Sequence, residues 1–258
     1  MELKLNNNNL KTSENKIKNV IAVLSGKGGV GKTTIAVNVA LAFAKLGFSV
    51  GILDIDIHGP NVPLLLGIKD AQLMMDENNL ILPYEYKNEQ DNITLRVIST
   101  DFLLKDKSNA VIWRGPLKHK LISEFLTKVK WGNLDYLIVD FPPGTGDETI
   151  SFSQLINQYL KSKVSALIVS MPQKLSLADA EKTIDFCKKT NMKIIGILEN
   201  MSGIFGQDTV KELAKKHNIK YLGSIKLSEK IIRENEESKI KVKEEFISIA
   251  REISKDSD

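Results

Sequence analysis

The chain has a single cysteine, Cys187, among its 258 residues. One thiol cannot form an internal disulfide, and it leaves no local cysteine cluster that could bind a metal within one chain. This usage fits a reducing compartment, so we expect a cytoplasmic protein.

The sequence also lacks a long apolar run. No stretch approaches the roughly 18 to 20 consecutive apolar residues of a membrane span, and the polar start does not resemble a secretory signal. Hydrophobic residues still make up 42% of the chain, which is enough for a sizeable core. We therefore expect a soluble protein with a disordered polar tail at 1–19 and a single domain at 20–258.

Arginine is scarce, and positive charge is not gathered in one place. Arginine occurs only at positions 96, 114, 233 and 251, and the net charge of +4 comes from lysines scattered among acidic residues. Nucleic-acid-binding proteins usually show a basic stripe or patch. We therefore expect no nucleic-acid partner.

Short apolar runs alternate with helical patterns after the tail. The runs are apolar on both faces, which predicts buried strands at 20–25, 50–55, 95–99, 136–140, 164–170 and 194–198. Helical patterns lie at 32–46, 117–130, 148–160, 174–190, 208–217 and 243–254. This alternation predicts a doubly wound α/β fold, with a mostly parallel sheet flanked by helices and ligands beyond the carboxyl ends of the strands. The irregular segment 67–92 predicts a loop-rich excursion or a small hairpin.

A glycine-rich segment at 26–33 follows the first predicted strand and opens the first helix. This is the context of a P-loop, in which backbone amides and a helix N-terminus face phosphate oxygens. Lys32 is expected to reach the phosphates, and the Thr33 hydroxyl to bind Mg²⁺. The residues predicted to bind the nucleotide here are Gly26, Lys27, Gly28, Gly29, Val30, Gly31, Lys32, Thr33 and Thr34.

Aspartates follow two further predicted strands. Asp54 and Asp56 lie on the same side of one strand end, about 7 Å apart, and Asp140 ends another apolar strand. Phosphoryl transfer to water needs positioning and charge neutralisation more than covalent chemistry. We therefore expect Asp56 to orient the attacking water, and Asp54 and Asp140 to join Thr33 at Mg²⁺, although Asp54 and Asp56 could exchange roles.

Several strings together resemble one family of ATPases. They are Asp54-Ile-Asp56-Ile-His-Gly59-Pro60-Asn61, Trp113-Arg114-Gly115-Pro116, Trp131-Gly132-Asn-Leu-Asp135-Tyr136, Asp140-Phe-Pro-Pro-Gly-Thr-Gly-Asp147 and Glu199-Asn200-Met201-Ser202. With the P-loop, they make the chain similar to the Mrp/ApbC iron–sulfur carriers of the deviant-Walker superfamily, from about Val20 to Arg233.

The resemblance implies an Mg²⁺-dependent ATPase that acts in iron–sulfur cluster assembly or transfer. It implies a homodimer in which each Lys27 reaches the phosphates bound by the other subunit, so Lys27, Lys32 and Asp56 would be catalytic. It also implies that Asn200 binds the adenine edge. The alternatives are a solvated loop lysine at Lys27 and a strand-to-loop cap at Asn200.

The chain departs from this family at its cluster site. Typical members carry C-x-x-C between the Asn-Met-Ser string and an Ile-Phe-Gly string, but here Ser202 runs through Gly203 directly into Ile204. A four-iron cluster bridged by two thiolates from each subunit cannot form in the usual place. Cluster donors, cluster acceptors or a cysteine-bearing paralogue are therefore the expected partners.

A second function remains open, a positioning ATPase that switches a protein partner or a membrane, as MinD does. The C-terminal segment carries an apolar stripe beside Lys241, Lys243 and Arg251, as an interfacial helix would. Glu244, Glu245 and Glu252 oppose anionic lipid, so we expect a last helix packed on the domain rather than a membrane partner.

Overall fold

The computed structural model describes residues 15–103, 115–160, 163–203, 209–227 and 242–255. Its strands are β1 (Lys16–Leu24), β2 (Val50–Asp54), β3 (Met74–Met75), β4 (Ile81–Leu82), β5 (Tyr84–Asn88), β6 (Ile93–Ser99), β7 (Asn133–Asp140), β8 (Lys163–Ser170), β9 (Lys193–Ser202) and β10 (Tyr221–Lys226). Its helices are α1 (Lys32–Lys45), α2 (Val62–Leu65), η1 (Thr100–Leu103), α3 (Gly115–Lys128), α4 (Asp147–Tyr159), α5 (Lys174–Lys189), α6 (Thr209–His217) and α8 (Glu244–Ser254).

The described strands form an 8-stranded sheet in the order β10-β9-β8-β1-β7-β2-β6-β5. Every neighbouring pair in it is parallel except β5 and β6, which are antiparallel at one edge. Strand β1 lies in the middle, and the register brings Asp140 of β7 beside Val23 of β1 and Asp54 of β2. The carboxyl ends of these three strands therefore meet at one place, where the P-loop begins.

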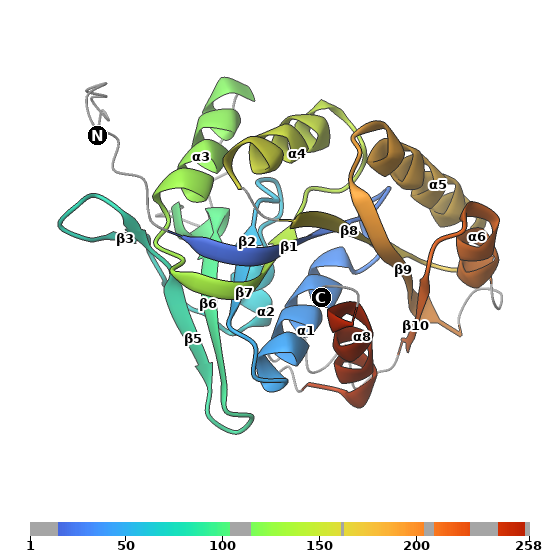
Figure 1. Ribbon diagram of the computed structural model, residues 1–258, viewed down its shortest axis with the longest axis horizontal. Helices are drawn as coiled ribbons and strands as arrows, with labels where there is room; N and C mark the ends of the chain where they lie inside the picture. Colours follow the sequence, from blue (N-terminus) through green and yellow to red (C-terminus); the bar gives the residue numbers. More distant parts are fainter. Residues whose placement is uncertain (1–14, 104–114, 161–162, 204–208, 228–241, 256–258) are drawn as a thin grey trace.

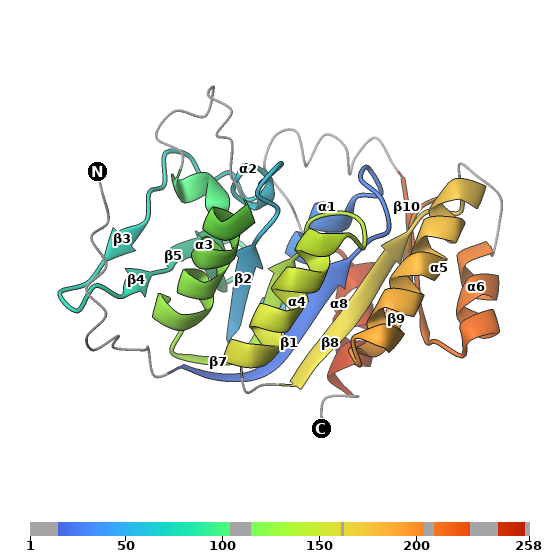
Figure 2. The same ribbon diagram turned by 90° about the horizontal axis from the view of Figure 1, so that it is seen from above.

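Helices cover both faces of the sheet (Figure 1). Helices α3, α4, α5 and α6 lie over one face, and α1 and α8 lie over the other, as the turned view also shows (Figure 2). Each face has its own buried apolar cluster. This double coverage explains why the central strands are apolar on both sides, and it confirms the predicted doubly wound, mostly parallel sheet.

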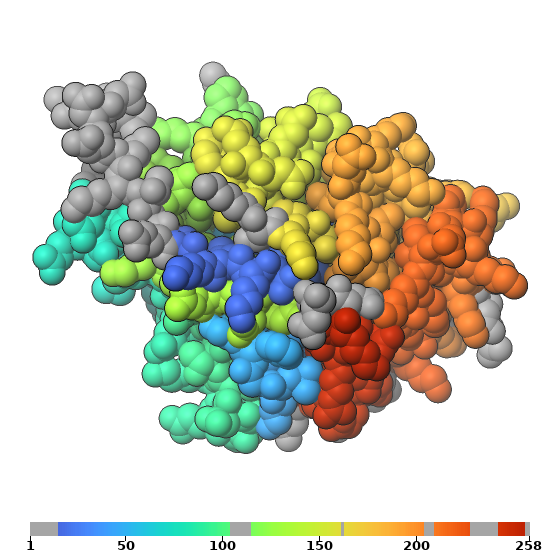
Figure 3. Space-filling view, viewed as in Figure 1, coloured from blue at the N-terminus to red at the C-terminus, as the bar shows by residue number. Residues whose placement is uncertain are grey.

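Helix α8 packs against α1 rather than standing free. Its apolar residues are buried, and they are Phe246, Ile247, Ile249, Ala250 and Ile253. Figure 3 shows the red C-terminal segment beside the light-blue segment near the start of the chain. The apolar side chains that an interfacial helix would turn toward a membrane are therefore buried in the core.

Several boundaries differ from the prediction. Strand β1 begins at Lys16 and its first residues pair with β7, so the predicted tail at 1–19 is wrong for residues 16–19. The sequence did not indicate this part of the strand because polar side chains alternate with apolar ones there. Segment 67–92 does contain an antiparallel pair, β3 with β4, but it also supplies β5 to the main sheet. Strand β10 was missed because it is a half-exposed edge strand with only Ile225 buried.

Some expectations fall outside the part of the chain that the structure describes. They are the tail at 1–14, Trp113 and Arg114 of the family-like string, and the junction at Ile204. Among the described helices, none is both long and apolar enough to cross a bilayer.

Candidate nucleotide-binding site

The P-loop connects the end of β1 to the start of α1, as its sequence predicts. Gly29 and Gly31 both have a φ of 81°, a backbone conformation that glycine adopts without strain. Helix α1 starts at Lys32, and its first amides have no partner from within the helix. The loop therefore presents glycine backbone and a helix N-terminus to one cleft, an arrangement suited to anions.

Lys32 and Thr33 converge on Asp140 from the end of β7. The Lys32 Nζ atom lies 2.5 Å from Asp140 Oδ1, and the Thr33 hydroxyl donates to Asp140 Oδ2 at 2.7 Å. Both Lys32 and Asp140 are buried. A buried lysine at a loop of this shape has the position needed to meet phosphate oxygens, and the Thr33 and Asp140 oxygens form a donor pair of the type that Mg²⁺ prefers.

Asp54 lies behind this group rather than in the cleft. Its carboxylate accepts hydrogen bonds from the Ser99 hydroxyl at 3.0 Å and from the backbone amides of Val62 and Asp56, each at 3.2 Å. Burial raises the pKa of Asp54 well above the usual range, and the neighbouring Asp140 carboxylate adds to the rise. The contacts of Asp54 hold the loop that carries Asp56 and the start of α2.

Asp56 lines the cleft, 4.0 Å from the Lys32 ammonium. Burial raises the pKa of the Asp56 carboxyl, while the positive charge of Lys32 opposes the rise. The structure thus separates the two aspartates that the strand pattern placed on one side. Asp56 faces the cleft, and Asp54 faces the protein.

The cleft has a volume of about 320 Å³ and contains most of the predicted phosphate-binding residues. Those that line it are Lys27, Gly28, Gly29, Gly31, Lys32, Thr33 and Thr34. Residues that the sequence reading did not assign also line it, namely Ser25, Asn61, Leu64, Leu65 and Pro143. Asn61 and Pro143 belong to the family-like strings, so the resemblance could have identified them as site residues. No sequence pattern marks Leu64 and Leu65 of α2 as site residues.

Three of the predicted nucleotide-binding residues lie outside the wall of the cleft. Gly26 packs against the backbone of Asp179 on α5, so closely that a Cβ atom would collide with it. The Val30 side chain is buried in the core. Asn200, at the end of β9, donates from Nδ2 to the Val30 carbonyl at 2.8 Å and thereby fixes the loop from behind.

Lys27 is held within its own subunit. Its Nζ atom lies 2.9 Å from Oε1 of Gln173, which precedes α5. Gln173 is not among the site residues predicted from the sequence, so this contact is known only from the structure. The position leaves the Lys27 side chain at the rim of the phosphate cleft, which it also lines.

Cys187 does not contribute to any such site. Its side chain is fully buried on α5, and burial raises the pKa of its thiol to about 12. Within the described ranges, no three His, Cys, Asp or Glu side chains are grouped in a way that could hold a metal ion.

Comparison with known proteins agrees with this geometry. A model of the ParA family described as NUBPL iron-transfer P-loop NTPase matches residues 16–256. The chain is 44% identical over 227 residues to a cytosolic Fe-S cluster assembly factor Nubp2 homolog of Drosophila ananassae, covering 84% of this chain and 85% of that protein. It is 39% identical over 251 residues to the cytosolic Fe-S cluster assembly factor CFD1 of Saccharomyces cerevisiae, covering 92% and 83%.

Solved structures give the same result. A nucleotide-binding protein from Archaeoglobus fulgidus in complex with ADP is 34% identical, with a TM-score of 0.73 over 86% of this chain and 87% of that one. The cell division ATPase MinD of Pyrococcus furiosus shares the fold with a TM-score of 0.66 at 23% identity, over 92% and 98% of the two chains. The predicted kinship with iron–sulfur carrier ATPases is confirmed, and the chain belongs to the NUBPL-type family of iron-transfer P-loop NTPases.

Proposed function

We propose that this protein binds and hydrolyses ATP and acts in iron–sulfur cluster assembly. The observation that carries the proposal is the convergence of Lys32, Thr33 and Asp56 with Asp140 at the carboxyl ends of β1, β2 and β7, in a chain of this family. These groups match what phosphoryl transfer requires, namely charge neutralisation and an oriented water.

Each side chain has a distinct part in this proposal. The P-loop amides and Lys32 bind the phosphates, and Asp56 orients the attacking water from the side of the cleft. Mg²⁺ fits the Thr33 hydroxyl and the Asp140 carboxylate, and when bound it would neutralise phosphate charge. Asp54 supports the magnesium side indirectly, because its oxygens are engaged by Ser99 and by backbone amides.

Asn200 is proposed to bind the adenine edge, as the family resemblance implies. Its Nδ2 atom already bonds the Val30 carbonyl, which places the side chain directly beside the P-loop. In this proposal the side-chain amide of Asn200 holds the P-loop through the Val30 carbonyl and also hydrogen-bonds the adenine base. ADP in the Archaeoglobus fulgidus relative supports an adenine nucleotide here.

We infer a homodimer that closes over the nucleotide, with Lys27 of each subunit reaching the phosphates of the other. Lys27 lies at the rim of the cleft and donates to the partly buried side chain of Gln173, a neutral acceptor whose hydrogen bond contributes only about 1 kcal/mol. Two large apolar side chains near these groups are exposed: Leu64 of α2, which lines the cleft, is 64% exposed, and Leu175 of α5, two residues after Gln173, is 63% exposed. Such residues suit an interface more than a solvated surface.

The part in cluster assembly does not include a cluster held by thiolates of this chain. A four-iron cluster needs about four thiolates, and a dimer would supply only two buried Cys187 side chains. We therefore propose that the protein works with a cysteine-bearing paralogue or with cluster donors and acceptors, in the cytosol, where its named relatives act.

The alternative of a membrane-positioning ATPase loses its main support. It rested on the apolar stripe of the last helix, and that stripe is buried against α1. The fold shared with MinD is common to both functions and does not favour either.

Calorimetry and a phosphate-release assay test the nucleotide part. The purified chain should bind Mg-ATP and release phosphate, Lys32→Ala should lose detectable binding, and Asp56→Asn should bind but turn over at least about a hundredfold more slowly. No heat of binding from the folded wild-type chain would refute the proposal. Anaerobic reconstitution with iron and sulfide tests the cluster part, and we expect an iron–sulfur absorption band only when the cysteine-bearing partner is present.

A further inference from the structure

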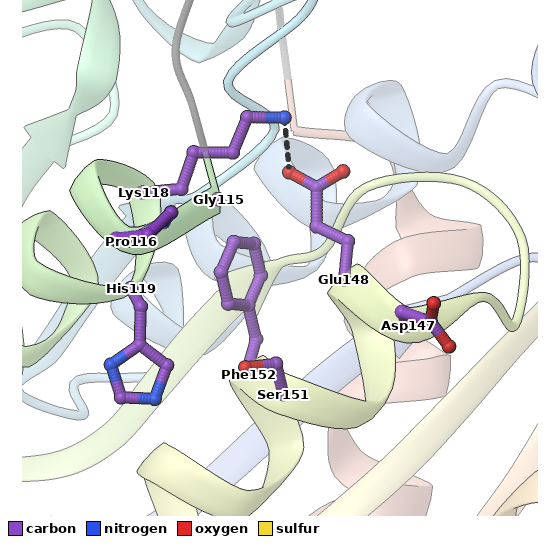
Figure 4. Close-up of a pocket in the computed structure, with 8 residues that line it drawn as sticks. All are labelled: Gly115, Pro116, Lys118, His119, Asp147, Glu148, Ser151 and Phe152. Carbon is purple, nitrogen blue, oxygen red and sulfur yellow. Dashed lines mark hydrogen bonds and ion pairs between the residues drawn. The ribbon is translucent and has the colours of Figure 1, made fainter.

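A lysine on α3 joins the two loops that border the phosphate cleft. The Lys118 Nζ atom lies 2.8 Å from Nε2 of His58 and 3.2 Å from Oε1 of Glu148. Figure 4 shows the Lys118 side chain reaching from α3 toward the Glu148 carboxylate on α4. A lysine ammonium only donates hydrogen bonds, so both His58 Nε2 and Glu148 accept from it.

The position of the two acceptors along the chain gives this contact its meaning. His58 lies two residues after Asp56, the group that we assign to the attacking water. Glu148 lies in the first turn of α4, directly after residues 141–147, which are here called the 141–147 loop although the last of them, Asp147, is the first residue of α4. This loop contributes Pro143 to the cleft, and its Gly144 N–H donates to the carbonyl of Ser25, the residue before the P-loop, at 2.8 Å. Lys118 therefore contacts the Asp56 loop at His58 and the residue that follows the 141–147 loop at Glu148. Lys118 is not among the residues that line the cleft.

The contact is more than a pair of charges meeting in solvent. The Lys118 side chain is 13% exposed, and Glu148 is 28% exposed. Lys118 borders a pocket of about 460 Å³ between the N-terminal turns of α3 and α4, together with Pro116 and Phe152. The Lys118–Glu148 pair is partly covered, so it is screened less by water and salt than a pair on an open surface, whereas the His58 side chain is 69% exposed and its Nε2 atom also lies 3.7 Å from Glu148 Oε2.

We propose that Lys118 is a positioning residue that holds the Asp56 loop and the 141–147 loop in a fixed relation to each other. This inference rests on the proposed hydrolysis of ATP. Lys118 acts through His58 and Glu148, and it touches neither the phosphates nor the P-loop. Its loss should misplace Asp56 relative to the phosphates without removing any group that binds the nucleotide.

Steady-state kinetics with matched variants provide the first test. Lys118→Met should lower kcat by about tenfold with the Kd for Mg-ATP within about twofold of wild type, because a positioning contact is lost while binding groups remain. Lys118→Arg, which keeps the charge and the donors, should recover most of kcat. Lys120→Met is the control, since it removes the same charge two residues along α3 and therefore on a different side of the helix.

A double variant shows whether the lysine acts through the proposed partner. Glu148→Gln should lower kcat in the same sense, and Lys118→Met combined with Glu148→Gln should fall little further than the more impaired single variant, because both remove one shared contact. Fully multiplicative losses in kcat would overturn the coupling.

Amide hydrogen exchange tests the link without any turnover. Lys118→Met should speed exchange by several-fold in peptides covering both 55–62 and 141–150, and Lys120→Met should leave both unchanged. A wild-type chain that binds Mg-ATP but releases no phosphate would refute the proposed hydrolysis, while the exchange data would still decide the link. Unchanged exchange in both peptides of Lys118→Met would overturn the inference, whatever the kinetics show.

Discussion

Cys187 is the only thiol of the chain, and its surroundings decide what it can do. It is fully buried on α5, and burial raises its pKa to about 12, so the thiolate is absent at neutral pH. An unfolded cysteine ionises at about pH 8.5 and reacts readily with thiol reagents. The side chain packs as a small apolar group in the buried cluster beside α5, which is the reason for its inertness.

We therefore expect Cys187 to resist iodoacetamide at pH 8 in the folded protein and to react fully in denaturant. Mass spectrometry of the labelled protein measures this directly. Cys187→Ser should fold but with lower stability, because a buried hydroxyl replaces a side chain that packs as an apolar one. Rapid labelling under native conditions would show that the thiol is accessible, and it would reopen the question of cluster ligation.

The place of the P-loop between β1 and α1 is the part of the site that was predictable, although Gly26 and Val30 lie outside the wall of the cleft. The chemistry of the P-loop depends on local backbone, and local backbone follows from glycine spacing. The roles of Asp54 and Asp56 were not predictable in this way, because they depend on Ser99 and Val62, which only the folding of β6 and α2 brings to Asp54. The alternation of side chains along a strand predicted that Asp54 and Asp56 lie on the same side. Strand β2 ends at Asp54, so this alternation does not apply to Asp56.

At the scale of a single strand, Gly51 shows how packing overrides propensity. Glycine weakens a strand interior, so the sequence alone favours alanine in the middle of β2. In the fold, a Cβ atom at Gly51 would lie 2.8 Å from Leu134 Cδ1 and 2.8 Å from Trp131 Cζ3. Both neighbours belong to the buried cluster under α3 and α4, and Trp131 is fully enclosed.

Gly51→Ala should therefore destabilise the protein by about 1 to 3 kcal/mol, the usual cost of overpacking a core. Urea unfolding followed by circular dichroism measures the change in the free energy of unfolding. Gly115→Ala is the matched control, since a Cβ atom there would meet nothing within 4 Å, and it should be neutral. Equal stability of Gly51→Ala and wild type would mean that β2 and the Trp131 segment can move apart enough for the methyl group at no cost in the free energy of unfolding.

For the molecule as a whole, the exposed Leu64 in the wall of the cleft and the exposed Leu175 near Gln173 suit closure over a second subunit. If Leu175 lies in that interface, Leu175→Asp should weaken Mg-ATP-dependent dimerisation by at least about tenfold, because it buries an unpaired charge. Size-exclusion chromatography with light scattering, in an Asp56→Asn background that keeps ATP intact, gives the dimer affinity. ADP binding by the monomer should be unchanged.

Met74→Asp provides the comparison for that experiment. Met74 is 67% exposed on β3, at the opposite end of the molecule from α5 (Figure 1). Met74→Asp therefore replaces a similarly exposed apolar residue that lies away from the cleft rim. If Met74→Asp weakened the dimer and Leu175→Asp did not, the subunits would meet through another surface.

Local features of the sequence are enough to predict the doubly wound fold, the phosphate loop and the family, and to show that the cysteine pair is absent. Each follows from short-range patterns, namely apolar runs, glycine spacing and residue identity, which need no knowledge of distant contacts. Three features are visible only in the folded chain: Asp54 faces the protein, Gln173 holds Lys27, and Lys118 joins two loops. These contacts link residues 30 or more positions apart, and their formation depends on the order of strands in the sheet, which no local pattern encodes.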